Sequence, residues 1–318
     1  SLEIKEKYGN DHEAATTYHQ LGMIAEMRRD FDSAETWYKK SLGIEEKLGN
    51  ERGAATTYHQ LGMIAQEKRD FDLAECWYNK SLEIEEKYGN EHGVAITYWN
   101  LGNIALKKKE LEVAEELLNE AKSIFENLFD EHNAAGVYHQ LGKLAEKKRD
   151  WDSAESWYKK SLEIREKQGD DYGAAQTYHQ LGRIAEEKED FDSAESWYRK
   201  SLKINEKQGD AHEAAITYHQ LGRIVQEKRD WDSAENCYKK SMKIKEKQGD
   251  AHGAAQTYGQ MGILAGLQGH FEESGKWLIK AILVFKKCNA PADVEQGENI
   301  FQITYNYADL TTQTKLKT

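Results

Sequence analysis

The chain has 318 residues, of which 31% are charged and 39% hydrophobic, and its formal net charge is −12. It contains one proline, where average usage of about 5% predicts roughly sixteen, so proline-rich linkers and collagen-like structure are excluded. No apolar run approaches the roughly 20 residues that a membrane helix needs, and no signal peptide is visible. The acidic balance argues against nucleic acid and anionic membranes as main partners.

The sequence repeats with a period of 40 residues, and a period in this range is typical of solenoids and arrays. Apolar and small residues of the first copy recur at i, i+4, i+7 and i+11 from Ala14 to Ala25, which predicts one face of an α-helix. A second helical pattern follows over about 33–48, and no alternation of period two occurs. Each copy therefore predicts two helices, helix A and helix B, in an all-α fold. The seven copies start at Asn10, Asn50, Asn90, Asp130, Asp170, Asp210 and Asp250.

Residues that are suited to ending one helix and starting the next lie at the boundaries between copies. Glycines at the end of helix B, such as Gly49, suit the left-handed conformation that closes a helix. The Asn or Asp that follows is a natural N-cap for the next helix A. Helix B also carries acidic and basic residues four positions apart, as at Glu35 and Lys39, which indicates a solvated outer face.

A glycine also recurs in the middle of every helix A. Because a mid-helix glycine costs roughly 1 kcal/mol relative to alanine, its repetition predicts a position where a neighbouring helix comes too close for a side chain. Ala34 and its equivalents predict a similar close contact in helix B, and Phe31 and Trp37 predict the large residues that fill the gaps. The glycines are Gly22, Gly62, Gly102, Gly142, Gly182, Gly222 and Gly262.

The string Tyr98-Trp-Asn-Leu-Gly-Asn103, followed by Ala114, resembles a tetratricopeptide (TPR) repeat, and the other six copies resemble it in the same way. The 40-residue spacing is similar to the longer repeats of kinesin light chains and of Pins-type cell-polarity scaffolds. The resemblance covers about residues 1–289 and implies a right-handed superhelix, an α-solenoid of antiparallel helix pairs. The family's usual proline after helix B is absent, so helix B is expected to continue for roughly another turn.

The two ends of the chain depart from this pattern. Residues 1–9 match residues 41–49, so we expect them to be the end of a truncated preceding repeat and the chain to be a fragment of a larger protein. Residues 10–289 hold the seven repeats. A C-terminal capping helix is expected over 290–310 and a loose tail over 311–318. Pro291 suits the first turn of that helix, and the apolar residues expected to turn inward are Ile300, Ile303, Tyr307 and Phe301.

The TPR resemblance implies that helices A line the concave side of the solenoid and that peptide ligands lie along it. The side chains left over on helix A share one face, because they lie at i, i+3 or i+4, and i+7, and they form three rows. The ladder row contains His19, His59, Trp99, His139, His179, His219 and Gly259. The carboxamide row contains Gln20, Gln60, Asn100, Gln140, Gln180, Gln220 and Gln260. The third row contains Met23, Met63, Asn103, Lys143, Arg183, Arg223 and Ile263.

These rows predict a groove that binds an extended peptide or a partner helix. Carboxamides both donate and accept hydrogen bonds, which suits a peptide backbone. The basic part of the third row, Lys143, Arg183 and Arg223, favours acidic residues in the ligand. Met23 and Met63 make the other end apolar and adaptable.

Two alternatives to this interpretation remain open. Recent duplication explains why the copies are so alike without any selection for a ligand. The arginines of the third row could also serve the helix itself, since Arg183 lies four residues before Glu187 and Arg223 lies four residues before Glu227.

Neither a metal site nor a catalytic site is predicted, and no cofactor is expected. One ladder histidine per helix A cannot converge with its neighbours on bonds of about 2.0–2.1 Å when neighbouring helices lie roughly 10 Å apart. No phosphate-binding glycine loop, HExxH motif or Ser/His/Asp order occurs. The three cysteines, Cys76, Cys237 and Cys288, are far apart without a CxxC, which predicts reduced thiols in a reducing compartment such as the cytoplasm.

Repeat 3 differs from the other copies. Its helix B carries Leu117-Leu118 in place of Trp-Tyr, and its exit, Leu128-Phe129-Asp130, lacks the glycine. A different exit geometry would change the local superhelix angle, so a functional bend or contact centred on Trp99, Asn100 and Asn103 is one interpretation. Drift compensated by Phe125 and Phe129 is the other.

The sequence therefore predicts a protein- or peptide-binding TPR scaffold without enzymatic activity. An alternative is a sensor or regulatory arm of a multidomain signalling protein, such as a STAND-type ATPase or a caspase-like effector, which would make an effector domain of the parent protein an intramolecular partner. A third hypothesis is a structural or oligomerisation spacer. Upstream sequence that encodes a nucleotide-binding or protease domain would favour the regulatory arm.

Overall fold

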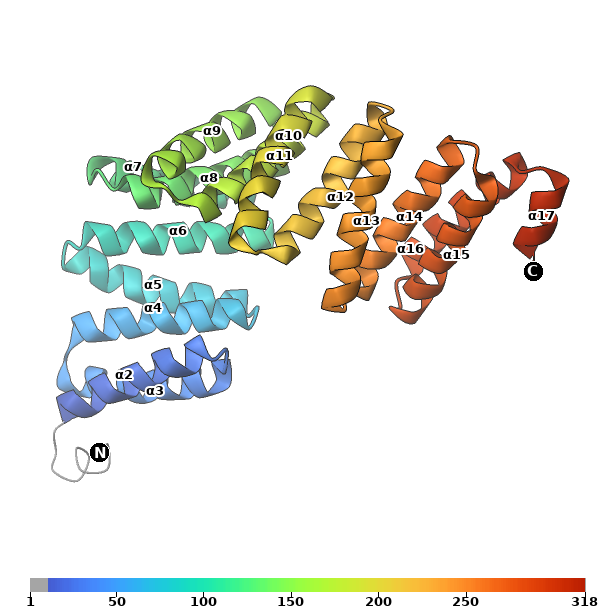
Figure 1. The fold of residues 1–318 in the computed structure, drawn as a ribbon. Helices are drawn as coiled ribbons and strands as arrows, with labels where there is room; N and C mark the ends of the chain where they lie inside the picture. The colour runs from blue at the N-terminus through green and yellow to red at the C-terminus, as the bar shows by residue number, and fades with distance from the viewer. Residues whose placement is uncertain (1–10, 318) are drawn as a thin grey trace. The chain divides into compact units, whose positions relative to one another are not determined.

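The computed structural model describes residues 11–317, and within that range it consists of helices joined by short turns, with no strand (Figure 1). The prediction of an all-α solenoid of helix pairs is confirmed. The A helices are α2 (Asp11–Met27), α4 (Glu51–Glu67), α6 (Glu91–Lys108), α8 (Glu131–Lys147), α10 (Asp171–Glu187), α12 (Ala211–Glu227) and α14 (Ala251–Leu267). The B helices are α3 (Phe31–Leu48), α5 (Phe71–Lys87), α7 (Leu111–Asn127), α9 (Trp151–Gln168), α11 (Phe191–Gln208), α13 (Trp231–Gln248) and α15 (Phe271–Lys287).

The chain divides into two compact units, one that ends at Ile164 and one that begins at Arg165. Within each unit, a helix packs chiefly against the helices before and after it in the sequence. Stability in such an array is approximately a sum of repeat and nearest-neighbour terms. The truncated repeat predicted at residues 1–9 and the N-cap predicted at Asn10 lie outside the described residues.

The mid-helix glycines of helix A face a large side chain of helix B in the same repeat. A Cβ atom built on Gly22 would lie 2.6 Å from Cε1 of Tyr38, and one built on Gly62 would lie 2.7 Å from Cδ1 of Tyr78. Both tyrosine rings are completely buried. The predicted close approach is confirmed, and the approaching group is a side chain rather than the neighbouring backbone. The equivalent large residues in the other repeats are Leu118, Tyr158, Tyr198, Tyr238 and Leu278.

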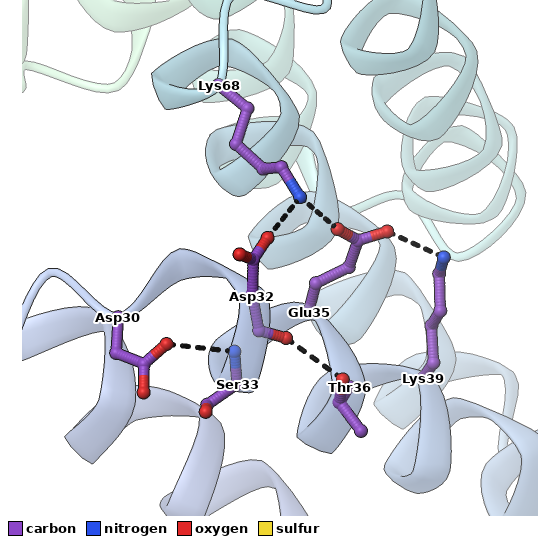
Figure 2. A network of polar contacts seen from close by, with 7 residues as sticks. All are labelled: Asp30, Asp32, Ser33, Glu35, Thr36, Lys39 and Lys68. Carbon is purple, nitrogen blue, oxygen red and sulfur yellow. Dashed lines mark hydrogen bonds and ion pairs between the residues drawn. The ribbon is translucent and has the colours of Figure 1, made fainter.

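The helix boundaries follow the predicted chemistry. Gly49 after α3 is left-handed with φ 68°, and the side chain of Asn50 then accepts a hydrogen bond from the Gly53 N–H at 3.2 Å. A second set of caps goes beyond the prediction. Asp30 accepts a hydrogen bond from the Ser33 N–H at 3.1 Å and so caps helix B (Figure 2). The same cap recurs at Asp70, Asp150, Asp190 and Asp230.

Consecutive repeats of the first unit are also joined by ion pairs on the outer surface (Figure 2). Lys68, at the end of α4, reaches back to Asp32 and Glu35 on α3 with N···O distances of 2.7 and 2.9 Å. Glu35 also pairs with Lys39 at 2.6 Å, as predicted, and hydrogen bonds from Lys39 and Lys68 lower the pKa of the Glu35 carboxyl. Because these groups are partly solvated, each pair contributes little stability by itself.

The turn after helix B of repeat 3 contains no glycine, yet its backbone has the same conformation as the turns of the other repeats. Phe129 is left-handed with φ 54°. The Asp130 N–H donates to the carbonyl of Phe125 at 2.9 Å, as the Asn90 N–H donates to that of Glu85 at 2.9 Å in the preceding repeat. The expectation of a different exit geometry is therefore wrong, because a residue with a Cβ adopts the glycine conformation and bears the strain.

Replacing Phe129 with glycine is expected to stabilise the chain by about 1 kcal/mol. A left-handed conformation costs a residue with a Cβ roughly 1–2 kcal/mol, and the ring of Phe129 is 91% exposed, so its removal sacrifices little burial. Thermal unfolding followed by circular dichroism measures the effect. The control is Phe129→Ala, which keeps the Cβ and should change Tm little. A lower Tm for the glycine variant than for the alanine variant contradicts the assignment of strain.

Helix α16 (Pro291–Tyr307) starts at the expected proline but presents a different face to the fold. Gly297 and Thr304 are buried, whereas Ile303 is 57% and Tyr307 is 74% exposed. The prediction that Ile303 and Tyr307 turn inward is wrong, because it assigned the buried face to the largest apolar side chains. The helix instead packs through its small residues, and a Cβ on Gly297 would lie 2.8 Å from Cγ1 of Ile282.

The remaining inward candidates, Ile300 and Phe301, are half-buried. The tail predicted at residues 311–318 differs from expectation, since α17 (Leu310–Lys317) forms there and packs on α15. An ion pair of 2.6 Å between Lys315 and Glu272 joins the two helices.

Candidate functional site

The ladder histidines of helix A pack against the buried tyrosine of helix B in the same repeat. In the first unit, the ring of His19 packs edge-on against Tyr38 and that of His59 against Tyr78, each with ring centroids 5.2 Å apart. Nδ1 of His19 is 3.2 Å from Oγ1 of Thr57, which belongs to the next helix A. These rings therefore contribute to packing between repeats and expose only part of their surface. His139 also packs against its tyrosine, at 5.2 Å from Tyr158.

The second unit repeats this arrangement. Nδ1 of His179 is 3.3 Å from Oγ1 of Thr217, and Nδ1 of His219 is 3.2 Å from Oγ1 of Thr257.

Burial lowers the pKa of His59 and His179 to about 4 and that of His219 to about 3. These three rings are therefore neutral at pH 7.

Acid is expected to destabilise the fold through these rings as the pH falls from about 6.5 to about 4. An unfolded histidine titrates near pH 6.5, whereas the folded chain keeps His179 neutral down to about pH 4. The unfolded state thus binds more protons in this window, and the free energy of unfolding decreases as the pH decreases. Urea unfolding midpoints across the window measure the slope. The double variant His179→Gln, His219→Gln should show a smaller slope, and an unchanged slope would count against this origin.

The carboxamide row lies beside the ladder. Gln20 is exposed, and the other predicted members, Gln60, Asn100, Gln140, Gln180 and Gln220, are half-buried. Gln180 and Gln220 accept hydrogen bonds from Nη1 of Arg183 and Arg223, each at 3.0 Å. The Asn100 amide nitrogen lies 3.4 Å from Nε2 of His59. Parts of this row are therefore held in place by their neighbours on helix A.

The third row is the most exposed of the three. Met23, Met63, Arg183 and Arg223 are exposed, and Asn103 and Lys143 are half-buried. Nη2 of Arg223 forms an ion pair of 2.8 Å with Oε1 of Glu186, on the preceding helix A. The alternative that Arg223 pairs with Glu227 is wrong, since the guanidinium reaches across to the neighbouring repeat instead of along its own helix.

Trp99, which replaces a ladder histidine, occupies the space next to the following repeat. A Cβ atom built on Gly136 would lie 2.5 Å from Cη2 of Trp99. The Trp99 ring meets Phe125 edge-on at 6.4 Å between centroids, and both Phe125 and Val137 are completely buried. The larger ring is thus accommodated by a glycine and by apolar neighbours. Nε1 of Trp99 is buried without a hydrogen-bond partner in the described residues.

The prediction did not include a hollow of about 450 Å³ in the second unit. It lies where the ladder row ends at Gly259, and a Cβ atom there would meet no other atom within 4 Å. Side chains of five helices, α12 to α16, line it, among them the buried Lys245 of α13. The signal was present in the sequence, since Gly259 breaks a row of histidines, but the contribution of helix B could not be read from helix A alone.

Within the described residues, no group of three His, Cys, Asp or Glu side chains could hold a metal ion. None of the helices in residues 11–317 is both long enough and apolar enough to cross a membrane. Cys76, Cys237 and Cys288 are free thiols.

Three solved structures illustrate which proteins this chain is similar to in fold. BtubC (BKLC) from P. vanneervenii is 24% identical over 66% of this chain and 88% of its own, with a TM-score of 0.59. A Signal Transduction ATPase with Numerous Domains (STAND) with a tetratricopeptide repeat sensor, from Pyrococcus horikoshii, is 18% identical over 98% of this chain, with a TM-score of 0.76. This chain spans 48% of that protein. The quorum sensor NprR from B. thuringiensis is 12% identical over 96% of this chain and 93% of its own, with a TM-score of 0.64.

Identities this low show a shared fold and no more, and a search of curated proteins finds no match. Two tetratricopeptide repeat family profiles do match the sequence. One covers residues 14–51, and the other covers 53–127, 133–207 and 210–287. These blocks span most of the chain and coincide with its helix pairs, so the chain belongs to the tetratricopeptide repeat family.

Proposed function

We propose that this chain is a protein- or peptide-binding scaffold that recognises its partner through the faces of helices A that helix B leaves uncovered. The observation that supports this proposal is the exposure of third-row residues next to carboxamides on the same helix A. These residues are Met23 and Met63 in the first unit and Arg183 and Arg223 in the second. Binding rather than catalysis is the proposed role. The free thiols favour a reducing compartment such as the cytoplasm as its location.

The chemistry of this face favours a ligand with acidic residues. Arg183 and Arg223 are exposed on α10 and α12, and each donates from Nη1 to a glutamine three residues earlier. Arg223 also pairs with Glu186. A guanidinium carries five N–H donors in a planar fork, which suits bidentate contact with a carboxylate. The chain carries a net charge of −12 and repels acidic partners at long range. Local cations therefore act only at close range, where screening by salt is weakest.

Paired triple variants test the proposed face. Replacing Lys143, Arg183 and Arg223 with alanine should weaken a bound acidic peptide several-fold and reduce the salt sensitivity of binding. The matched control replaces Lys159, Arg199 and Lys239, which pair with glutamates on the outer face of helix B. Peptides are first selected on the unchanged chain from a library of short random sequences, and titration calorimetry at two salt concentrations then compares the variants. A larger loss in the helix B triple would place the ligand on the opposite face.

A sensor or regulatory arm of a larger signalling protein is the second candidate. It is favoured by the match of 98% of this chain to a STAND protein that has a TPR sensor, since this chain corresponds to about half of that protein. In that arrangement an effector domain of the parent protein would be the intramolecular partner. Sequencing the gene upstream decides the point: a nucleotide-binding or caspase-like domain supports the arm, and a continuous array of repeats contradicts it.

A further inference from the structure

The outer face of helix B carries polar or small residues in the six repeats before the last one. Two positions four residues apart lie on this face. The first position holds Lys39, Asn79, Asn119, Lys159, Arg199 and Lys239. The second position is exposed in every repeat and holds Gly43, Glu83, Ser123, Glu163, Lys203 and Lys243. The basic residues at the first position pair with a glutamate four residues earlier, as is typical of a helical face in contact with water.

Helix α15 of the last repeat has an apolar outer face instead. Ile279 and Leu283 occupy the two positions and are 36% and 55% exposed. Four residues before Ile279, Gly275 replaces the glutamate that the six preceding B helices carry. Because Ile279 and Leu283 remain in contact with water, packing within the chain does not account for this change. Exposed apolar residues in such a row are typical of an interaction surface.

Helix α17 covers the beginning of this face and shows what it accepts. The side chain of Leu316 lies where a Cβ atom on Gly275 would be, so the leucine packs on the glycine. Beside it, Lys315 pairs with Glu272 at 2.6 Å. The contact thus combines a helix, an apolar side chain and an ion pair. With α17 in place, Ile279 and Leu283 are still exposed, so the remainder of the face continues an existing helix contact.

Lysines surround the exposed part of the face. From Gly275 to its end, α15 contains no carboxylate and carries Lys276, Lys280, Lys286 and Lys287. By helical spacing, Lys286 and Lys287 lie on opposite sides of the line from Ile279 to Leu283. Lys286 pairs with Glu298 at 2.8 Å, whereas Lys287 forms no ion pair within residues 11–317. Apolar residues between lysines complement a partner whose apolar residues lie between carboxylates.

The same charges disfavour two other occupants. A second copy that docks through its own α15 would bring lysines of the two copies together, and like charges across an interface disfavour association. Lysines beside apolar residues also suit an anionic membrane, but the net charge of −12 repels such a surface.

We infer that the outer face of α15 is a docking surface for an acidic amphipathic helix of a partner protein. The partner helix packs its apolar side chains on Ile279 and Leu283, next to α17, and its carboxylates lie near Lys286 and Lys287. An amphipathic helix laid on an apolar surface is a recurring mode of peptide recognition. This surface belongs to helix B, so the inference goes beyond the proposed function of the helix A faces and does not depend on it.

The preceding repeat supplies the test variant. The α15 double variant, Ile279→Lys with Leu283→Lys, introduces the residues found at the equivalent positions Lys239 and Lys243 of α13. Since both side chains point to water, the fold should tolerate the change, and circular dichroism confirms that the variant remains helical.

The matched control makes the same chemical change elsewhere in the second unit. Leu267→Lys with Ile303→Lys replaces two apolar side chains that are 59% and 57% exposed on α14 and α16. It therefore adds the same charge at a similar exposure but leaves the outer face of α15 unaltered.

The probe is a displayed library of helical peptides that have leucines at i, i+3 and i+7 and random residues at the flanking positions. Selection on the unchanged chain should enrich Asp and Glu at the flanks. Affinity of the enriched peptides should fall at least tenfold in the α15 double variant and stay within about twofold in the matched control. Lys286→Gln with Lys287→Gln should weaken binding about threefold and lower its salt sensitivity, because screening acts on the charges and not on the apolar contact.

Several results would overturn the inference. The docking surface is refuted if no peptide is enriched, or if the enriched peptides bind the α15 double variant as tightly as the unchanged chain. Alanine at Lys143, Arg183 and Arg223 should leave their affinity unchanged. Loss of binding in that triple variant would place these peptides on helix A, which supports the proposed function and refutes this surface.

Two further measurements distinguish the other occupants. Sedimentation velocity detects a second copy, and flotation with phosphatidylserine vesicles detects a membrane. Self-association or vesicle binding that the α15 double variant abolishes would replace the partner helix with that occupant. A monomeric chain that does not bind the vesicles supports the partner helix.

Discussion

Gly182→Leu is expected to destabilise the chain by about 3 kcal/mol, at the upper end of what overpacking a core costs. A Cβ atom at this position would already lie 2.7 Å from Cδ1 of Tyr198, and leucine adds three further carbons. Tyr198 is completely buried, and Oη donates to Glu186 at 3.1 Å, so the ring cannot move aside without losing packing and a hydrogen bond. Chemical unfolding followed by circular dichroism measures the change.

Gly43→Leu is the matched control for this variant. Gly43 also lies within a helix, but a Cβ built there meets no atom within 4 Å. Because glycine inside a helix is less favourable than leucine by roughly 0.5–1 kcal/mol, the control should be neutral or slightly stabilising. Equal unfolding midpoints for Gly182→Leu and Gly43→Leu would falsify the packing assigned to the mid-helix glycines.

The features that the sequence predicted best are those that every repeat shares. A residue that recurs seven times in phase reports a local requirement, so the close approach at the mid-helix glycine and the Asn50 cap could be inferred from the pattern alone, whereas the facing tyrosine or leucine could not. The second cap, at Asp30, was missed because the residue before it, Arg29, takes a left-handed conformation that the pattern usually assigns to glycine.

The features that the sequence predicted poorly depend on contacts between repeats. Arg223 lies four residues before Glu227, which suggested a pair along the helix, but the nearer carboxylate is that of Glu186 on the neighbouring helix A. Lys245 lies on helix B, and nothing in its own repeat indicates that it lines a hollow under Gly259. Side-chain spacing along one helix carries no information about distances across the array.

The prediction of which face of α16 points inward failed for a related reason. Large apolar residues mark the buried face of a helix when they fill a core, but here the neighbouring helix approaches closely and selects small residues instead. Gly297 meets the side chain of Ile282, while Ile303 and Tyr307 stay exposed. Apolar size alone therefore could not distinguish the packed face of α16 from a face that remains available to a ligand.

Gly136→Ile is expected to destabilise the first unit by about 2–3 kcal/mol, and the size of the effect should depend on the residue at position 99. Isoleucine is the residue found at the equivalent position 96, where the preceding ladder residue is His59. At position 136 the added Cβ would lie 2.5 Å from the ring of Trp99, so the same side chain that fits against a histidine overpacks against the indole.

A double-mutant cycle with Trp99→His measures this dependence. Trp99→His alone should be destabilising, because it leaves a cavity between Gly136 and Phe125, which the indole now contacts at 6.4 Å between ring centroids. The double variant rebuilds the histidine-isoleucine pair of the neighbouring repeat and should lose less stability than the sum of the two single variants, with a coupling above about 1 kcal/mol. Additive effects would mean that Trp99 and Gly136 vary independently, and Gly136 would then not be a compensating change for the larger ring at position 99.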